Sequence, residues 1–171
     1  MSKIMHLSLF LAVISALAGG ALSFANQVTA PVIAENNARL ERESLMTMYP
    51  DAAEDDFKEI EFNMDSKTVQ KVYEYEDKLI FNMKVPGYKD GTTFLVSINT
   101  NDKTVDQYYP LSNGDTKGLG SKVMESDFIN NVNGKASDDS IDTISGATIS
   151  SSGVVNGINE ASTYVDQLKG E

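Results

Sequence analysis

Cysteine is absent from this sequence of 171 residues. Without a thiol, the chain forms no disulfide, binds no iron–sulfur cluster through thiolates and builds no structural zinc site of the usual cysteine type. It also lacks an N-terminal cysteine for lipid attachment. Histidine occurs once, as His6, inside the first apolar stretch and without a partner for acid–base chemistry. These absences argue against hydrolysis or group transfer by the chain's own side chains.

Basic residues are also few. The 14 Lys and Arg stand against 25 Asp and Glu, which gives a formal net charge of −11. Binding to a nucleic-acid backbone requires basic patches, so we expect no nucleic acid among the partners. A negative surface keeps a domain soluble and away from anionic lipid. With 41% apolar residues, a chain of this length suits one compact domain together with an anchor.

One long apolar run lies at the N-terminus. Residues 4–25 are mostly Leu, Ile, Ala, Val, Phe and Gly, and these 22 residues would extend as a helix over roughly the 30 Å of a hydrocarbon core. We therefore predict a single-pass membrane anchor over residues 1–28. Lys3 precedes the run, which favours a cytoplasmic N-terminus and an extracytoplasmic position for the rest. A cleaved secretory signal is the alternative, because Ser23 and Ala25 are small residues of the kind that signal peptidase requires.

Residues 29–56 are predicted to form a juxtamembrane helix and an acidic linker. Good helix formers continue to residue 48, and Pro50 ends the helix because proline lacks an N–H and disfavours helix in the residue before it. The acidic residues that follow are Asp51, Glu54, Asp55 and Asp56. They lack the spaced Asp/Asn/Gly loop of a calcium site, so we interpret them as a solvated linker without a metal.

Residues 57–171 have the pattern of an antiparallel sheet flanked by helices, which is an α+β fold. Four segments have the composition or the period-two alternation of half-buried strands, namely residues 69–75, 79–85, 94–98 and 104–111. Polar turns connect them into a meander of about four strands. Residues 121–131 are predicted to form a short helix that places Leu119 over the sheet.

The C-terminal segment has the spacing of a helix. Its apolar residues on one face are Val154, Ile158, Ala161, Val165 and Leu168. A hydroxyl from the serines at 150–152 could cap its start by accepting a hydrogen bond from a free backbone N–H. Thr148 lies where the preceding polar loop turns into the helix, beside N–H groups and a partial positive charge that favour a phosphate or another anion. Gly146 and Ala147 leave room there for a bulky group to approach the backbone.

The segment Ser145-Gly146-Ala147-Thr148, with Asp142 three residues before it, resembles the flavinylation motif of the FMN-binding domain family. That family includes the subunit designated G of the Rnf ion-translocating oxidoreductase and the subunit designated C of the sodium-pumping NADH:quinone reductase. In these proteins a flavin transferase joins FMN, through its phosphate, to the hydroxyl of the last Thr of the motif. The resemblance implies a covalent phosphoester of FMN on Thr148. It also implies that Asp142, Ser145, Gly146 and Ala147 form the site that the transferase recognises.

A second segment supports the same resemblance. Residues 114–120 read Gly-Asp-Thr-Lys-Gly-Leu-Gly and are similar to the Glu-Thr-Pro-Gly-Leu-Gly loop that packs beside the flavin in the family. Asp115 stands in place of Glu and Lys117 in place of Pro, so the resemblance assigns no role to these two. The residues that it implies as flavin contacts are Thr116, Gly118, Leu119 and Gly120. By itself the loop would be interpreted as a hairpin turn or a strand-to-helix connection.

Several tyrosines could be interpreted as further contacts to a flavin ring. They are Tyr73, Tyr75, Tyr88, Tyr108 and Tyr109. Aromatic residues favour strands in any case, so packing in the core or on a strand face is the better prediction for each of them.

The sequence therefore leads to one main hypothesis and two alternatives. The main hypothesis is an exported, membrane-tethered α+β domain that carries covalent FMN on Thr148 and transfers electrons. The resemblance implies an Rnf-type ferredoxin:NAD oxidoreductase complex that moves ions, with other membrane subunits and a flavin transferase as partners. The first alternative is a stand-alone exported flavin carrier that feeds an extracellular reductase. The second is a surface binding domain without a cofactor.

Overall fold

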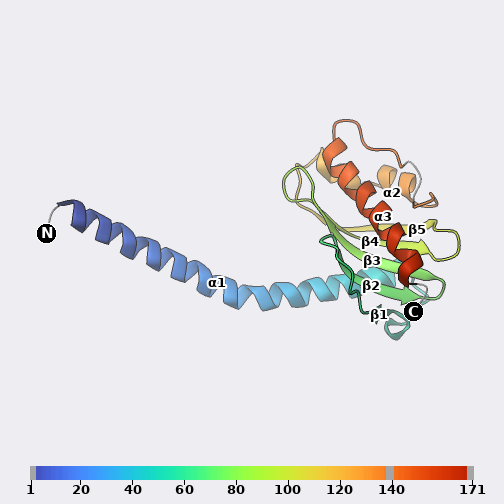
Figure 1. Cartoon of the computed structure of the whole chain (residues 1–171), viewed down its shortest axis with the longest axis horizontal. Coiled ribbons are helices and arrows are strands. Elements are labelled where there is room, and N and C mark those ends of the chain that lie inside the picture. The colour runs from blue at the N-terminus through green and yellow to red at the C-terminus, as the bar shows by residue number, and fades with distance from the viewer. Residues whose placement is uncertain (1–2, 138–140, 169–171) are drawn as a thin grey trace. The chain divides into compact units, whose positions relative to one another are not determined.

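A computed structural model describes residues 3–137 and 141–168 of the chain. The chain divides into two compact units, Met1–Glu43 and Ser44–Glu171. Helices and strands are labelled in Figure 1. Each unit is described by itself below.

The described residues of the first unit form one helix. This helix, α1 (Lys3–Met48), continues through Pro31 and extends into the first residues of the second unit. It contains a window with a mean hydropathy of 2.1 whose side chains are not buried, and it is long and apolar enough to cross a membrane. The predicted apolar N-terminal helix is thus confirmed. The helix ends two residues before Pro50, as expected from the lack of an N–H in proline.

The second unit is built on a five-stranded antiparallel sheet (Figure 1). Its strands, in spatial as well as chain order, are β1 (Lys58–Ile60), β2 (Val69–Tyr75), β3 (Lys78–Val85), β4 (Thr92–Asn99) and β5 (Val105–Asn113). The four predicted strands are confirmed with small changes at their ends. The prediction missed β1, because three residues with the sequence Lys-Glu-Ile carry no alternating pattern.

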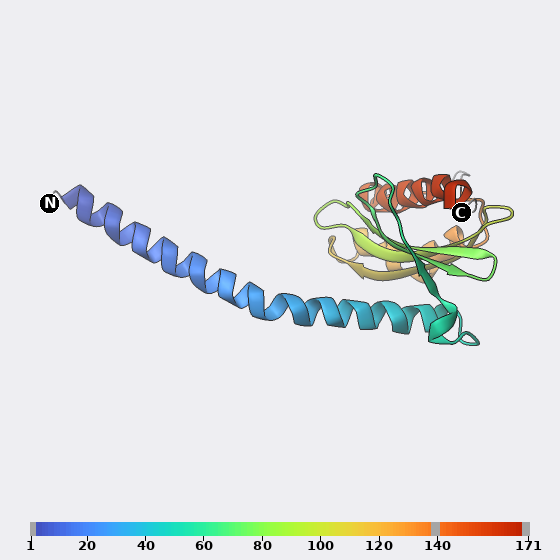
Figure 2. The same cartoon turned by 60° about the horizontal axis from the view of Figure 1, so that its bottom comes forward.

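Helix α3 (Thr148–Leu168) covers one face of the sheet, as Figure 2 shows. The predicted apolar face of this helix packs there against alternate residues of the central strands. Buried members of this core include Phe81, Met83, Phe94, Val96, Val154, Ile158, Ala161 and Val165. This packing follows from the two periods of the sequence, since residues two apart in a strand and three or four apart in a helix share a face.

The opposite face of the sheet is covered as well. Leu45 and Met48, at the end of α1, pack there against Ile80 and Leu95. Strands β3 and β4 are therefore buried almost continuously, with both sets of alternate residues inside. The prediction of half-buried strands is wrong for these two, because a second layer of apolar side chains covers the face that was expected to meet solvent.

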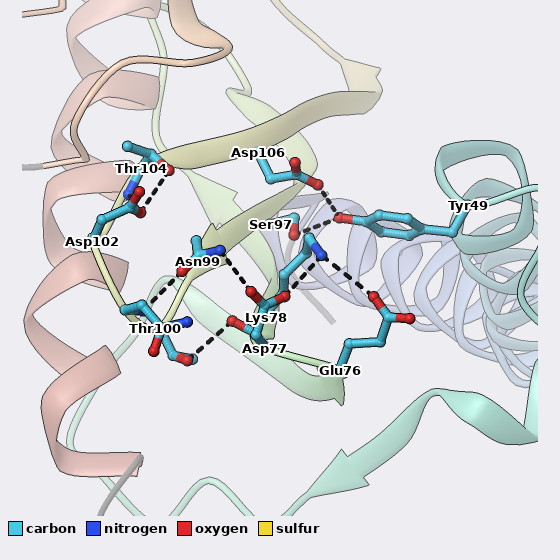
Figure 3. A network of polar contacts seen from close by, with 11 residues as sticks. Tyr49, Glu76, Asp77, Lys78, Ser97, Asn99, Thr100, Asp102, Thr104 and Asp106 are labelled. Carbon is cyan, nitrogen blue, oxygen red and sulfur yellow. Dashed lines mark hydrogen bonds and ion pairs between the residues drawn. The ribbon is translucent and has the colours of Figure 1, made fainter.

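Tyr49 fixes this second layer to the sheet (Figure 3). Its hydroxyl oxygen lies 2.6 Å from Ser97 Oγ and 2.6 Å from Asp106 Oδ2. Because a carboxylate only accepts, the Tyr49 O–H donates to Asp106. Burial and this hydrogen bond raise the pKa of Tyr49 well above its usual range. Lys78 lies 5.9 Å from the centre of the Tyr49 ring and pairs with Asp77 at 2.9 Å.

The predicted helix over residues 121–131 is wrong in one respect, because it is broken in two. A 3-10 helix, η2 (Gly120–Met124), is followed by α2 (Ser126–Val132), and Glu125 between them has an extended backbone. The Val123 carbonyl accepts a hydrogen bond from the buried Tyr108 hydroxyl at 3.2 Å, so a tertiary contact takes the place of a helical partner. A further short 3-10 helix, η1 (Glu54–Asp56), lies before β1.

Two glycines allow α3 to lie close to the end of β3. A Cβ at Gly153 would collide with the carbonyl oxygen of Pro86, and one at Gly157 would lie 2.6 Å from Val85 Cγ1. Glycine costs about 1 kcal/mol relative to alanine inside a helix, so close approach is the physical reason for glycine here. The contact sets the early turns of α3 beside Pro86, which precedes the loop that contributes to the site below.

We predict that Gly153→Ala lowers the free energy of unfolding by about 1–3 kcal/mol, because the new methyl group meets backbone that cannot easily move. Helix propensity alone predicts that the substitution raises the free energy of unfolding by about 1 kcal/mol, so the steric clash and the helix propensity act in opposite directions. Denaturant unfolding of the variant and the parent measures the change in this free energy. The exposed Asn156 of the same helix is the control, and Asn156→Ala should leave stability unchanged or slightly higher. A Gly153→Ala protein as stable as the parent would contradict the close contact.

Candidate functional site

A hollow of about 410 Å³ lies where α3 begins. Three segments line it: the loop after β3, the loop after β5, and the first turn of α3 with the residues just before it. The lining residues are Tyr88, Thr116, Leu119, Gly120, Gly146, Ala147, Thr148, Ile149 and Ser150. Such a volume is within the usual range for small-molecule sites. None of these described residues carries a charge at neutral pH, so the lining suits a largely apolar group.

Helix α3 begins at Thr148, and Ala147 occupies the capping position, since Ser151 N donates to Ala147 O at 3.0 Å. The prediction that a serine at 150–152 caps the helix is therefore wrong, because all three lie inside the helix. Ser151 instead uses its hydroxyl to accept from Ile144 N at 3.0 Å and to contact Ala147 O at 3.0 Å. Ser151 therefore binds the loop that precedes the helix, at Ile144, and does not bind the free N–H groups of the helix.

The first turn of α3 offers an anion site. In an α-helix the first N–H groups have no intrahelical partner, and here they belong to Thr148, Ile149 and Ser150. Ala147 has no side-chain oxygen to accept from them. The partial positive charge of the helix start adds to their attraction for a negative group. Thr148 is exposed, lies in the same turn and lines the hollow.

Gly146 keeps the approach to this turn open. Its φ of 81° lies in the left-handed region that glycine adopts without strain, and a Cβ placed on it would meet no atom within 4 Å. The backbone before Thr148 is therefore reachable from the hollow.

The carboxylate of Asp115 joins the three segments that line the hollow. Its Oδ1 accepts hydrogen bonds from the backbone N–H groups of Lys89, Asp90 and Gly91, at 2.8, 3.1 and 3.2 Å. Its Oδ2 accepts the hydroxyl hydrogen of Ser150 at 2.5 Å. One side chain on the loop after β5 thus holds both the loop after β3 and the start of α3.

Close packing and hydrogen bonding determine the charge state of Asp115. A Cβ on Gly87 would collide with its carboxylate, and one on Gly120 would lie 2.5 Å from its Cβ. Burial raises the pKa of the Asp115 carboxyl, but the hydrogen bonds from Ser150 and the three backbone N–H groups lower it by more. The net pKa lies well below its usual range, so the group is ionised at neutral pH.

Six of the residues singled out from the sequence line the hollow together: Thr116, Leu119, Gly120, Gly146, Ala147 and Thr148. Gly118 and Ser145 are exposed and do not line it. Asp142 is exposed and lies beside α2, where its carbonyl oxygen accepts from Asn131 Nδ2 at 3.1 Å. The prediction that Leu119 packs over the sheet is wrong, because its side chain is 50% exposed at the hollow and Val123 is buried in its place.

Sequence reasoning missed Ile149, the place of Ser150 in the lining and the role of Asp115, and it preferred packing to a flavin contact for Tyr88. Tyr88 is 72% exposed and lines the hollow, so the prediction of core or strand packing is wrong for it. Tyr108, in contrast, is buried in the core as predicted. Pro86 and Gly87 end the strand before Tyr88, and this signal in the sequence separates Tyr88 from tyrosines on strand faces.

We predict that Asp115→Asn lowers the free energy of unfolding at neutral pH by about 2 kcal/mol or more, because hydrogen bonds to a charged group contribute about 1.5–3 kcal/mol each. The folded-state pKa is depressed, so this stabilisation is complete above the unfolded-state pKa of about 3.9 and declines as the pH falls toward the folded-state value. Denaturant unfolding at about pH 7 and about pH 3 should give a smaller difference between variant and parent at the lower pH. The exposed Asp55 provides the control variant, Asp55→Asn. An equal difference at both pH values would contradict the ionised state.

Comparison with known proteins bears on this site directly. The model of the FMN-binding domain family matches residues 87–163, a range that includes every residue lining the hollow. Over 161 residues the chain is 26% identical to the subunit designated G of the proton-translocating ferredoxin:NAD(+) oxidoreductase complex of Clostridium ljungdahlii, an alignment that covers 84% of this chain and 81% of that protein. The resemblance noted in the sequence is thereby confirmed. Residues 87–163 thus match the FMN-binding domain.

Proposed function

We propose that this chain is an electron-transfer subunit that carries FMN covalently on Thr148. The proposal is carried by three features that lie together: the exposed Thr148, a helix start that has no side-chain cap among the described residues, and a hollow whose described lining is uncharged. A phosphate needs donors and positive potential, whereas a flavin ring needs a flat apolar space. The match of residues 87–163 to the FMN-binding domain supports FMN as the ligand.

Thr148 would become the attachment point through its hydroxyl. Thr148 Oγ1 would be the nucleophile toward the phosphorus of a donor that holds FMN in a phosphoanhydride, and the donor's leaving phosphate and the hydroxyl proton would be released. No electrons are gained or lost. The described lining of the hollow has no charged side chain, so the base comes from a flavin transferase. The side chains of Asp142 and Ser145, together with Gly146 and Ala147, would form the surface that this enzyme recognises.

The chain's own residues then have separate tasks. N–H groups of the first turn of α3 offset the charge of the phosphate, as at other helix starts. Gly146 leaves space beside the ester, while Thr116, Leu119 and Gly120 form the far wall of the hollow. When bound, FMN supplies one- and two-electron transfer. A covalent bond is useful outside the cytoplasm, where a lost cofactor could not readily be replaced.

The wider context of the proposal is a membrane complex. We propose residues 1–28 as a retained anchor, 29–56 as a connecting segment, and 57–171 as the flavin domain on the extracytoplasmic side. The apolar part of α1 supports the anchor. The relation to a component of a proton-translocating complex supports other membrane subunits as partners. On this proposal the chain passes electrons within an Rnf-type ferredoxin:NAD oxidoreductase, and ion movement depends on the assembled complex.

We predict that Thr148→Val abolishes covalent flavin, because the methyl group that replaces the hydroxyl cannot form an ester. Protein produced together with a flavin transferase is denatured, separated on a gel and viewed under ultraviolet light. The parent band should fluoresce, Thr148→Val should be dark, and Thr148→Ser should retain part of the signal. Thr143→Val is the matched control, since Thr143 is exposed in the same segment but does not line the hollow. A dark parent band would refute the proposal.

The anchor leads to a second prediction. Intact protein purified from membranes should have the mass of the full chain plus one FMN less one water, because ester formation removes water overall. Mass spectrometry of the intact protein reports in one measurement whether the N-terminal segment is retained and whether FMN is attached. A mass that lacks the first 25 or so residues would show a cleaved signal and contradict the retained anchor.

A further inference from the structure

One ionised side chain, that of Asp115, touches two residues in the wall of the hollow. Asp115 is only 9% exposed, and its Oδ2 accepts the hydroxyl hydrogen of Ser150 at 2.5 Å. A Cβ placed on Gly120 would lie 2.5 Å from the Cβ of Asp115. Ser150 and Gly120 both line the hollow. A full negative charge therefore lies one residue away from the space that the proposed flavin would enter.

The other charges next to this lining are exposed. Lys89 follows Tyr88 in the sequence and Lys117 follows Thr116, and both lysines are exposed. Water and salt screen exposed charges, whereas a buried charge acts through a medium of lower dielectric constant. Among the described residues that adjoin the lining in sequence, Asp115 is thus the charge whose field is screened least.

The charge of Asp115 is also constant near neutral pH. Burial raises the pKa of its carboxyl, but the hydrogen bonds from Ser150 and from three backbone N–H groups lower this pKa by more. These four donors bring dipoles and no net charge, so they moderate the field of the carboxylate without cancelling it. A group in the hollow that gains an electron is repelled by this fixed negative charge. Its reduced form is destabilised, and its reduction potential falls.

We propose that Asp115 lowers the reduction potential of the FMN carried on Thr148, and that Ser150 moderates this effect through its hydrogen bond. The inference rests on the proposed function and deepens it, because it concerns the redox property of the same site. Asp115 sets the surroundings of the flavin and takes no part in forming the ester. No bond to Asp115 forms or breaks, and the electron that reduces the flavin comes from the redox partner.

The test uses the full chain loaded with FMN, and the intact mass gives the extent of loading for each variant. The flavin is reduced stepwise with dithionite, without oxygen and beside a reference dye, and absorbance gives its midpoint potential. Asp115→Asn removes the charge and keeps the size of the side chain, so the midpoint potential should rise. Ser150→Ala keeps the charge and removes one of its four donors, so the midpoint potential should fall.

The opposite signs separate an electrostatic role from a structural one. Both variants weaken the same contact between Asp115 and Ser150, so a loosened helix start alone would move the two potentials in the same direction. Asp127→Asn is the control, because Asp127 is exposed and its loss changes the net charge equally. The midpoint potential of this control should equal that of the parent.

The outcomes distinguish this inference from the proposed function. A parent protein that carries no flavin would refute the attachment at Thr148. Loaded variants of Asp115 and Ser150 whose potentials equal that of the parent, or shift in the same direction, would overturn the role of Asp115 and leave the attachment intact. Should Asp115→Asn fail to fold or to load, Ser150→Ala decides: a lower potential supports the proposal, and an equal or higher one overturns it.

Discussion

The buried carboxylate of Asp115 is the interaction on which the site depends. It accepts three backbone N–H groups from residues 89–91 and the hydroxyl of Ser150, so one negative charge joins three segments that are distant in the sequence. A buried charge is tolerated only when it is well hydrogen-bonded, and four donors meet that requirement here. Gly87 and Gly120 leave the space that the carboxylate fills. The shape of the hollow therefore follows from one polar contact and from the small residues around it.

The site is also coupled to the core. The early turns of α3 lie against Pro86 through Gly153, and the buried face of the same helix packs on β3 and β4. On the far face of the sheet, Tyr49 and its partners hold a second apolar layer in place (Figure 3). A movement of α3 would thus disturb the helix start and the sheet together. The proposed electron carrier would benefit from such rigidity, because the protein's part would be to orient the flavin ring and set its surroundings.

The sequence predicted those parts that depend on local pattern. The alternation in residues 69–111 and the apolar face from Val154 to Leu168 correspond directly to the strands and to α3. The sequence did not predict the features that depend on tertiary contacts. The three residues of β1 are too few to show a period, and the second layer over β3 and β4 comes from the end of α1. The role of Asp115 arises from partners 24 to 35 residues away, and the exposure of Tyr88 depends on the end of a strand at Pro86.

The central claim is that one hydroxyl, on Thr148, tethers the flavin. Other hydroxyls lie in or near the hollow, on Ser145, Ser150 and Thr116. The test must therefore identify which residue carries the flavin. The most direct measurement is fragmentation mass spectrometry of the peptide that contains residues 142–150, from protein isolated from its native membrane. The account predicts an added FMN phosphoryl group localised to Thr148. An unmodified peptide, or a flavin on another hydroxyl, would contradict it.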